Sequence, residues 1–169
     1  SNLERLLYLS CGRDAAKTKE LMEQLSKNGK YEITPEMKEF MKDFSAGYAD
    51  MEENAKEIKK VFDDTGYLID THTGVAAAVY EQYKAKTGDA TKTVIASTAS
   101  PYKFSRSVME AVLGKKEDTD EFALIDEMER ISGVKIPQAI EEIRDAKILH
   151  NRQCKPEEME ETVKQTFSK

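Results

Sequence analysis

The sequence of 169 residues has no tryptophan, only two cysteines and four prolines, and no long hydrophobic run. No stretch approaches the roughly 20 apolar residues that a membrane-spanning helix needs, so we expect no membrane segment. Eight glycines and four prolines are too few for a sandwich or barrel, in which turn residues recur about every ten positions. Lysine, glutamate, alanine, methionine and leucine are abundant, which favours helices.

The sequence also lacks an excess of basic residues. Lysine and arginine number 26 against 32 acidic residues, which leaves a net charge of −6 at pH 7. Because a phosphate-backbone binder normally carries a basic face or tail, we expect no nucleic-acid partner. Cys11 and Cys154 form no CxxC pair, which indicates a reducing compartment and predicts a cytoplasmic protein. His150 stands four residues before Cys154, but no second pair accompanies them, so we predict no metal site.

Helix start and stop signals recur along the chain and predict a mostly α-helical fold. Asp14 precedes an apolar-periodic run, Thr34 is a cap followed by proline, and Asp50 with Glu53 has capping-box spacing. The ranges predicted to be helical are 1–12, 14–29, 34–47, 50–66, 70–88, 100–114, 120–131, 137–144 and 156–167. No repeat or flexible linker interrupts them, so we expect one compact unit over residues 1–169.

An apolar stripe within the third predicted helix repeats at intervals of three and four residues. It consists of Met37, Phe40, Met41 and Phe44. A binding groove and a core-facing stripe both have this spacing, and we interpret it as core.

One short segment breaks the helical pattern. Thr93–Ala96 is a continuous apolar and β-branched run, which suits a strand buried on both faces. Weaker candidates lie at 67–69 and 147–149. A buried strand needs partners on both edges, because its backbone groups must be paired. The fold class predicted is therefore mostly α with one or two short strands, as part of a larger α/β protein whose other strands lie outside this chain.

Two places could carry chemistry. The predicted strand leads into hydroxyl side chains at 97–100, and open α/β sheets bind ligands at the carboxyl ends of their strands. The alternative is a turn whose hydroxyls only satisfy the backbone. Asp70 and His72 stand together before a helix, where His72 is a candidate base or ligand, but we favour the alternative that Asp70 or Thr71 only caps the helix. No glycine-rich phosphate loop and no GxSxG motif is present, so we assign no catalytic residue.

Three ordered elements resemble bacterial and fungal threonine synthases. Residues 1–7 (SNLERLL) are similar to the SNFERLL element of that family. Residues 65–76 (TGYLIDTHTGVA) resemble its GYxxDPHTAVA element, and residues 97–104 (STASPYKF) resemble STAHPAKF. Residues 132–137 also look like the C-terminal end of the family. The departures are Leu3 for Phe, Thr71 for Pro, Gly74 for Ala and Ser100 for His, the last of which weakens any proton-carrying role at position 100.

The resemblance implies a pyridoxal 5'-phosphate-dependent lyase with the tryptophan-synthase-β type of fold, known as fold type II. Such enzymes convert O-phospho-L-homoserine and water to L-threonine and phosphate in threonine biosynthesis. The family's cofactor lysine and phosphate loop lie upstream of SNFERLL, and neither motif occurs here. The resemblance therefore implies a C-terminal part that needs the missing N-terminal part and is inactive alone. It singles out Thr98 as the hydroxyl that faces the cofactor's pyridine nitrogen, with Ser97 as the alternative.

A second reading remains open from the sequence. The same composition and helix pattern also suit a free-standing helical module without catalysis. Such a module would bind a partner through an exposed apolar strand or groove.

Overall fold

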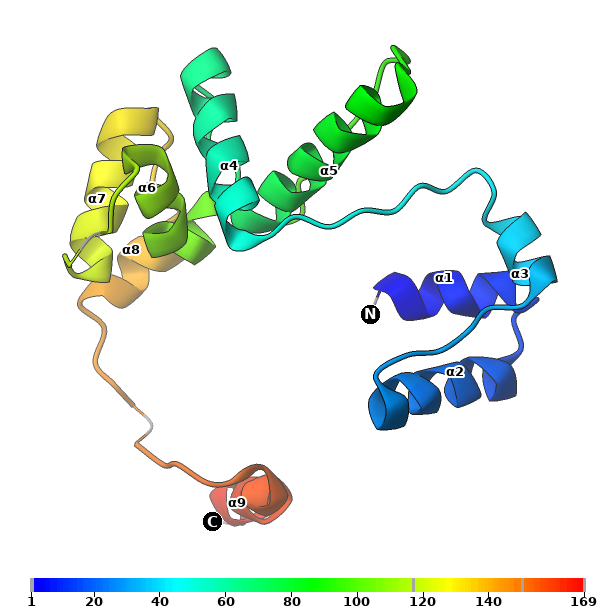
Figure 1. Cartoon of the computed structure of the whole chain (residues 1–169). Helices are drawn as coiled ribbons and strands as arrows, with labels where there is room; N and C mark the ends of the chain where they lie inside the picture. Colours follow the sequence, from blue (N-terminus) through cyan, green and yellow to red (C-terminus); the bar gives the residue numbers. More distant parts are fainter. Residues whose placement is uncertain (1, 117, 150, 169) are drawn as a thin grey trace. The chain divides into compact units, whose positions relative to one another are not determined.

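The computed structural model describes residues 2–116, 118–149 and 151–168, and within these ranges all regular secondary structure is helical (Figure 1). The prediction of a mostly α-helical chain is confirmed. Contacts group the chain into two compact units, which comprise residues up to 57 with 72–96, and residues 58–71 with those from 97 onward. We call them unit 1 and unit 2. The prediction of one compact unit over residues 1–169 stays a prediction.

The first three helices of unit 1 enclose a small core of their own. They are α1 (Asn2–Ser10), α2 (Ala15–Asn28) and α3 (Pro35–Phe40). Leu7, Leu21 and Met37 are almost fully buried at its centre. The Asp14 side chain accepts a hydrogen bond from Lys17 N at 3.0 Å and so begins α2 where the sequence predicts.

α3 is shorter than predicted, because it ends at Phe40 and not near Gly47. Met37 is buried, but Phe40 and Phe44 remain 49% and 58% exposed. These exposed phenylalanines contribute little tertiary packing, and a short helix without such packing is marginal because ordering its backbone costs conformational entropy. The interpretation of the stripe as core is right for Met37 and Met41 and wrong for the two phenylalanines.

The segment after α3 runs along α5 (Thr71–Thr87). Gly47 approaches this helix so closely that a Cβ atom there would lie 2.8 Å from Val79 Cγ1. Gln82 Nε2 also donates a hydrogen bond to the Tyr48 carbonyl oxygen at 3.1 Å. A Cβ atom at position 47 would therefore force the Val79 side chain or the segment itself to shift.

α4 (Met51–Thr65) begins with the predicted capping box. Glu53 N donates to Asp50 Oδ1 at 2.8 Å, and Asp50 N donates to Glu53 Oε2 at 2.9 Å. In the part of α4 that belongs to unit 2, Lys59 Nζ donates to the Val112 carbonyl oxygen at 3.2 Å. This bond joins α4 to α6 (Ser105–Leu113).

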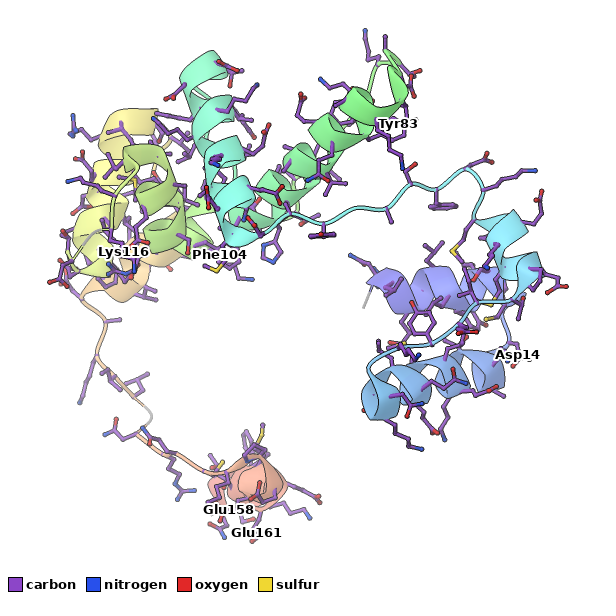
Figure 2. All side chains as sticks on the ribbon, viewed as in Figure 1. Asp14, Tyr83, Phe104, Lys116, Glu158 and Glu161 are labelled. Atoms are coloured by element: carbon purple, nitrogen blue, oxygen red, sulfur yellow. The ribbon has the colours of Figure 1, made fainter. Side chains whose placement is uncertain are left out.

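Unit 2 is centred on α6 and α7 (Glu121–Ser132), followed by α8 (Gln138–Arg144). Val108, Met109 and Met128 are fully buried between these elements. The short helix η1 (Pro101–Phe104) leads into α6, and η2 (Pro156–Glu158) leads into α9 (Met159–Phe167). The labelled acidic residues Glu158 and Glu161 lie at the start of this last helix (Figure 2).

The predicted strand at Thr93–Ala96 is not formed within the described part of the chain, and neither are the weaker candidates at 67–69 and 147–149. Val94 is 90% exposed and Ile95 is 37% exposed. The physical reason is that a strand is stable only when a neighbour pairs with its backbone groups. No neighbouring strand is available among the described residues, so the segment has no regular secondary structure.

Candidate functional site

The predicted site residues lie in the segment that connects residues 93–96 to η1. Ser97 and Thr98 are both exposed, and the Thr98 hydroxyl makes no hydrogen bond within the described part of the chain. Ser100 differs, because its Oγ accepts a hydrogen bond from Tyr102 N at 3.3 Å and caps η1. The backbone-capping explanation therefore holds for Ser100, whereas the Thr98 hydroxyl is available to a ligand.

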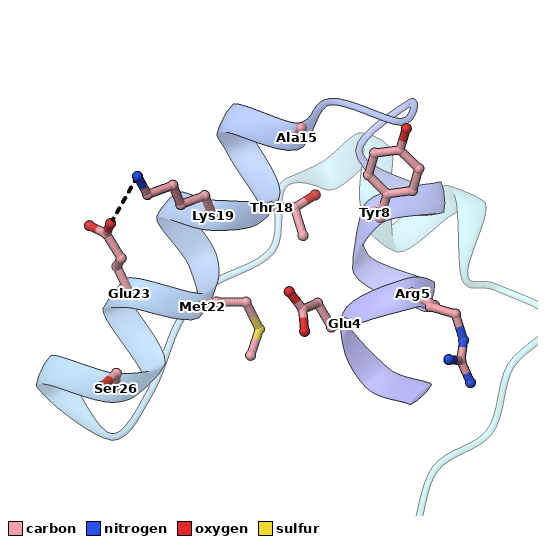
Figure 3. A pocket seen from close by; sticks show the side chains of 9 residues that line it. All are labelled: Glu4, Arg5, Tyr8, Ala15, Thr18, Lys19, Met22, Glu23 and Ser26. Atoms are coloured by element: carbon pink, nitrogen blue, oxygen red, sulfur yellow. Dashed lines mark ion pairs between the residues drawn. The ribbon is translucent and has the colours of Figure 1, made fainter. Parts of the chain in front are cut away.

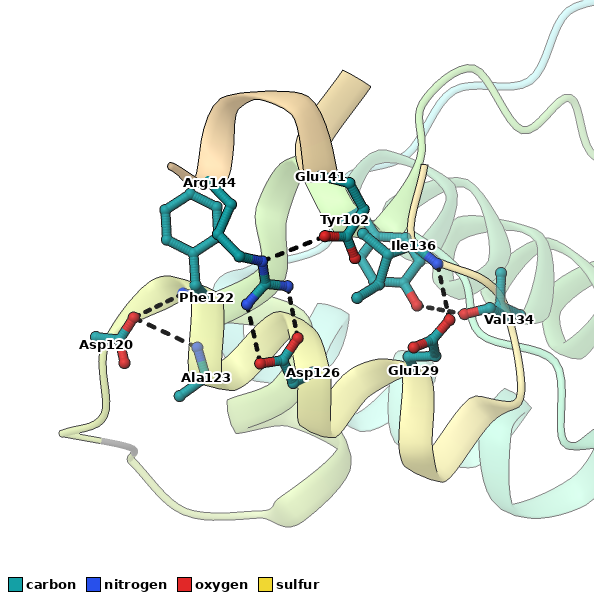
Figure 4. A network of polar contacts seen from close by, with 10 residues as sticks. All are labelled: Tyr102, Asp120, Phe122, Ala123, Asp126, Glu129, Val134, Ile136, Glu141 and Arg144. Carbon is teal, nitrogen blue, oxygen red and sulfur yellow. Dashed lines mark hydrogen bonds and ion pairs between the residues drawn. The ribbon is translucent and has the colours of Figure 1, made fainter. Parts of the chain in front are cut away.

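A buried tyrosine fixes the chain on the carboxyl side of these hydroxyls. Tyr102 is 3% exposed, and its hydroxyl donates a hydrogen bond to the Val134 carbonyl oxygen (Figure 4). Burial raises the pKa of Tyr102, so it stays a donor at neutral pH. Two residues beyond this acceptor, Ile136 N donates to Glu129 Oε1 at 3.1 Å. The end of the Thr98 segment is thus attached to the core of unit 2.

The side chains of Asp70 and His72 differ in burial. Asp70 is fully buried before α5, whereas His72 is exposed in the first turn of this helix. The helix dipole stabilises a carboxylate at a helix N-terminus. Because Asp70 is buried at such a position, we interpret it as a structural residue. The exposed imidazole of His72 remains a candidate base or ligand.

An arginine joins α8 to α7, and sequence analysis did not identify it. Arg144 binds Asp126 through two bonds of 3.0 and 2.6 Å and lies 5.1 Å from the centre of the Phe122 ring (Figure 4). Hydrogen bonding to Arg144 lowers the pKa of Asp126, and the same bonds raise the pKa of Arg144. No local spacing signal predicts a pair 18 residues apart. Because all the partners of Arg144 are side chains of this chain, we interpret Arg144 as a structural residue.

The grooves of unit 1 include two of more than 500 Å³, beside a smaller one of about 360 Å³ that is lined by Gly47 and Val79 among others. One, of about 610 Å³, lies between α1 and α2 and is lined by side chains of both charges, including Arg5, Lys19 and Glu23 (Figure 3). Lys19 and Glu23 face each other at 3.9 Å, so this groove presents no net charge that would select an ion. The other groove, of about 540 Å³, lies over α5 beside residues 93–96.

The turn that enters residues 93–96 is held to α5 by side chains. Tyr83, which lies near the C-terminal end of α5 (Figure 2), donates through its hydroxyl to Asp89 Oδ2 at 2.9 Å. Asp89 Oδ1 also accepts from Thr91 N at 2.9 Å. Bonds from Thr91 and Tyr83 lower the pKa of Asp89, and the bond to Asp89 raises the pKa of Tyr83. We call these three residues the Tyr83 clasp.

Neither a metal cluster nor a membrane helix is found in the part of the chain that the structure describes. There, no group of three or more His, Cys, Asp or Glu side chains is placed to hold a metal ion. No described helix has the length and apolarity needed to cross a membrane. Cys154 is an exposed free thiol, and His150 lies outside the described residues.

Residues 73–148 match the family model described as "Threonine synthase, C-terminal". The chain is related to the C-terminal part of threonine synthases. The match includes Ser97 and Thr98, whereas residues 1–7, the first element of the resemblance, lie outside it. The resemblance stated from the sequence is confirmed, while the roles of the two hydroxyls stay predictions.

Individual relatives agree with the family match. The chain is 32% identical over 113 residues to Threonine synthase-like 1 of Macaca fascicularis, covering 66% of this chain and 15% of that protein. It is 29% identical over 120 residues to Threonine synthase of Methylobacillus glycogenes, covering 69% of this chain and 25% of that protein.

A solved structure also matches. It is a crystal structure of PLP-bound threonine synthase from Brucella melitensis, with a TM-score of 0.53 and 27% identity, over 79% of this chain and 32% of that one. The chain therefore has the fold of part of a PLP threonine synthase, and it spans only about a seventh to a third of the relatives that it matches.

Proposed function

We propose that this chain is the C-terminal part of a threonine synthase and supplies one wall of its cofactor site. The full-length protein converts O-phospho-L-homoserine and water to L-threonine and phosphate. The observation that carries this proposal is the match of residues 73–148 to the family's C-terminal model, supported by the similarity to a PLP-bound threonine synthase.

The hydroxyl pair fits one function in such a site, which is contact with the pyridine ring of pyridoxal phosphate. When bound, this cofactor draws electrons from the carbon atoms of the amino-acid substrate. A hydroxyl donates a hydrogen bond to a neutral pyridine nitrogen, whereas a carboxylate would stabilise the protonated ring. Thr98 suits this role because its hydroxyl is exposed and makes no hydrogen bond to another described residue. Side chains alternate along an extended segment, so we expect only one of the two hydroxyls to face the ring.

The remaining parts of the site come from outside this chain under the proposal. The lysine that holds the cofactor and the loop that binds its phosphate belong to the N-terminal part of the full-length protein. The 169-residue chain alone is then inactive, because a hydroxyl wall without these groups neither retains the cofactor nor positions the substrate.

The test is an assay of the full-length protein that contains this chain, supplied with pyridoxal phosphate and O-phosphohomoserine. We expect threonine and phosphate in equal amounts. Thr98→Ala should lower activity or cofactor affinity by about fivefold or more, since a lost hydrogen bond costs on the order of 1 kcal/mol. Thr98→Ser keeps the hydroxyl and is the matched control, which should retain most of the activity.

The Ser97→Ala variant separates the two hydroxyls. If it lowers activity while Thr98→Ala does not, the assignment moves to Ser97. If neither variant changes turnover or affinity, the segment is structural and the site assignment is wrong. Absence of threonine synthase activity in the full-length protein contradicts the proposed reaction.

A further inference from the structure

The sequence around the candidate site hydroxyls contains no acidic side chain. Residues 90–109 hold no aspartate or glutamate, although the chain carries 32 of them in 169 residues. This is the longest acid-free stretch in the sequence. Its part in unit 2, residues 97–109, carries Lys103 and Arg106. The hydroxyls of Ser97 and Thr98 therefore lie on a positively charged segment of a chain whose net charge is −6.

The two cations of this segment differ in what they bind. Arg106 Nε donates to Glu121 Oε1 at 2.7 Å, and its Nη2 donates to the Thr119 carbonyl oxygen at 2.7 Å. The exposed Lys103 Nζ makes no ion pair or hydrogen bond within the described part of the chain, and it lies 5.6 Å from the centre of the Phe104 ring. This ring contact restricts the lysine side chain, so less entropy is lost when the ammonium group binds an anion.

The backbone holds Lys103 close to Thr98 within unit 2. Tyr102 is 3% exposed, and its hydroxyl donates to the Val134 carbonyl oxygen. Lys103 N donates to the Ser100 carbonyl oxygen at 3.0 Å and closes a turn, so its Cα atom lies within about 14 Å of the Thr98 Cα atom. A lysine stem together with a phosphorylated four-carbon substrate covers a distance of this order.

We propose that Lys103 binds the phosphate group of O-phospho-L-homoserine. This inference rests on the proposed function. A phosphate monoester carries close to two negative charges at neutral pH, and a lysine ammonium group binds it as a point charge. Under the proposed function the phosphate of the cofactor is held by a loop outside this chain. The phosphate that remains for Lys103 is that of the substrate.

The test uses three variants of the full-length protein, each loaded with pyridoxal phosphate. Lys103→Met removes the charge and keeps an apolar stem, whereas Lys103→Arg keeps the charge. Lys116→Met is the matched control, because Lys116 is also exposed and forms no ion pair within the described residues, but lies between α6 and α7 (Figure 2). For each protein we measure steady-state kinetics with O-phosphohomoserine, calorimetric binding of inorganic phosphate, and the Kd of pyridoxal phosphate.

Lys103→Met should lower kcat/KM and weaken the binding of inorganic phosphate by about tenfold or more, because a hydrogen bond to a charged group is lost. Lys103→Arg should lose less, since the charge remains. Lys116→Met should match the parent protein. The Kd of pyridoxal phosphate should be the same in every variant.

Two outcomes overturn the proposal. The first is a Lys103→Met variant that matches Lys116→Met in kinetics and in phosphate binding. The second is weaker binding of pyridoxal phosphate by Lys103→Met, which assigns the lysine to the phosphate of the cofactor.

Calorimetry distinguishes a failure of this proposal from a failure of the proposed function, because it requires no turnover. If the full-length protein makes no threonine but loses phosphate binding in Lys103→Met, the phosphate site is supported and only the proposed reaction is rejected. A full-length protein that neither makes threonine nor binds phosphate overturns both proposals.

Discussion

The α6–α7 pair and the segment 93–98 differ in where their stabilising partners lie. Met109 and Met128 are fully buried between helices, and α7 is capped by Asp120 at its start and by Gly133 at its end. Val94, by contrast, is 90% exposed. A helix completes most of its hydrogen bonds within itself, whereas a strand depends on residues distant in the sequence.

Removing a buried side chain from the helix pair should have the largest effect. Met109→Ala leaves a cavity in a fully buried site, and we expect it to lower the free energy of unfolding by about 2–5 kcal/mol. Val94→Ala in the same 169-residue chain should change it very little. Urea denaturation followed by circular dichroism measures both. Equal losses of unfolding free energy for Met109→Ala and Val94→Ala would contradict the difference between the two regions.

Adding a side chain at the closest backbone approach should have the next largest effect. Gly47→Ala places a Cβ atom against Val79 Cγ1, and overpacking of this kind costs about 1–3 kcal/mol. Val79→Ala removes the methyl groups that clash, so the double variant should recover part of the loss. A Gly47→Ala chain as stable as the parent in urea would show that the segment does not pack on α5.

Loss of a helix cap should have a smaller effect. The Asp120 side chain accepts hydrogen bonds from Phe122 N and Ala123 N at 2.9 and 3.3 Å. Asp120→Ala should therefore destabilise α7 by about 1 kcal/mol. Asp118→Ala removes an exposed carboxylate of the same type that caps no helix, and should be neutral. The unfolding curves of Asp120→Ala and Asp118→Ala should differ. Coincident curves would contradict the capping role of Asp120.

The smallest expected effect is a dependence of folding stability on pH. Hydrogen bonding to Arg144 holds the pKa of Asp126 below its ordinary value of 3.8. The pair therefore contributes stability above pH 3.8, and this contribution is lost as the pH falls through the lower pKa of the folded state. Asp126→Asn should melt slightly earlier than the parent at neutral pH, and the difference should vanish in acid. A difference that persists at low pH would assign the effect to packing.

Most of the helices were predictable because their signals are local. Asp14, Thr34, the capping box of Asp50 and the prolines at helix starts all act within one turn. The end of α3 was not predictable, because it depends on which side chains find a core. The same holds for Gly47 and Val79 and for Arg144 and Asp126, which meet only after folding.

The candidate site was predictable only through the family resemblance. Spacing alone left Ser97–Ser100 as either a ligand site or a turn, and the structure separates Ser100, which caps η1, from the exposed Thr98. The strand at Thr93–Ala96 was predicted from its composition, but composition does not say where its partners are. Within the described residues it remains unpaired.

The most direct measurement is the mass of the protein after addition of pyridoxal phosphate and reduction with borohydride. Lysines in solvated helical faces, such as Lys56 beside Glu52, stay protonated and are poor nucleophiles. We predict one reduced cofactor adduct on the full-length protein, at a lysine outside residues 1–169, and none on the 169-residue chain. One specifically labelled lysine within residues 1–169 would contradict the account.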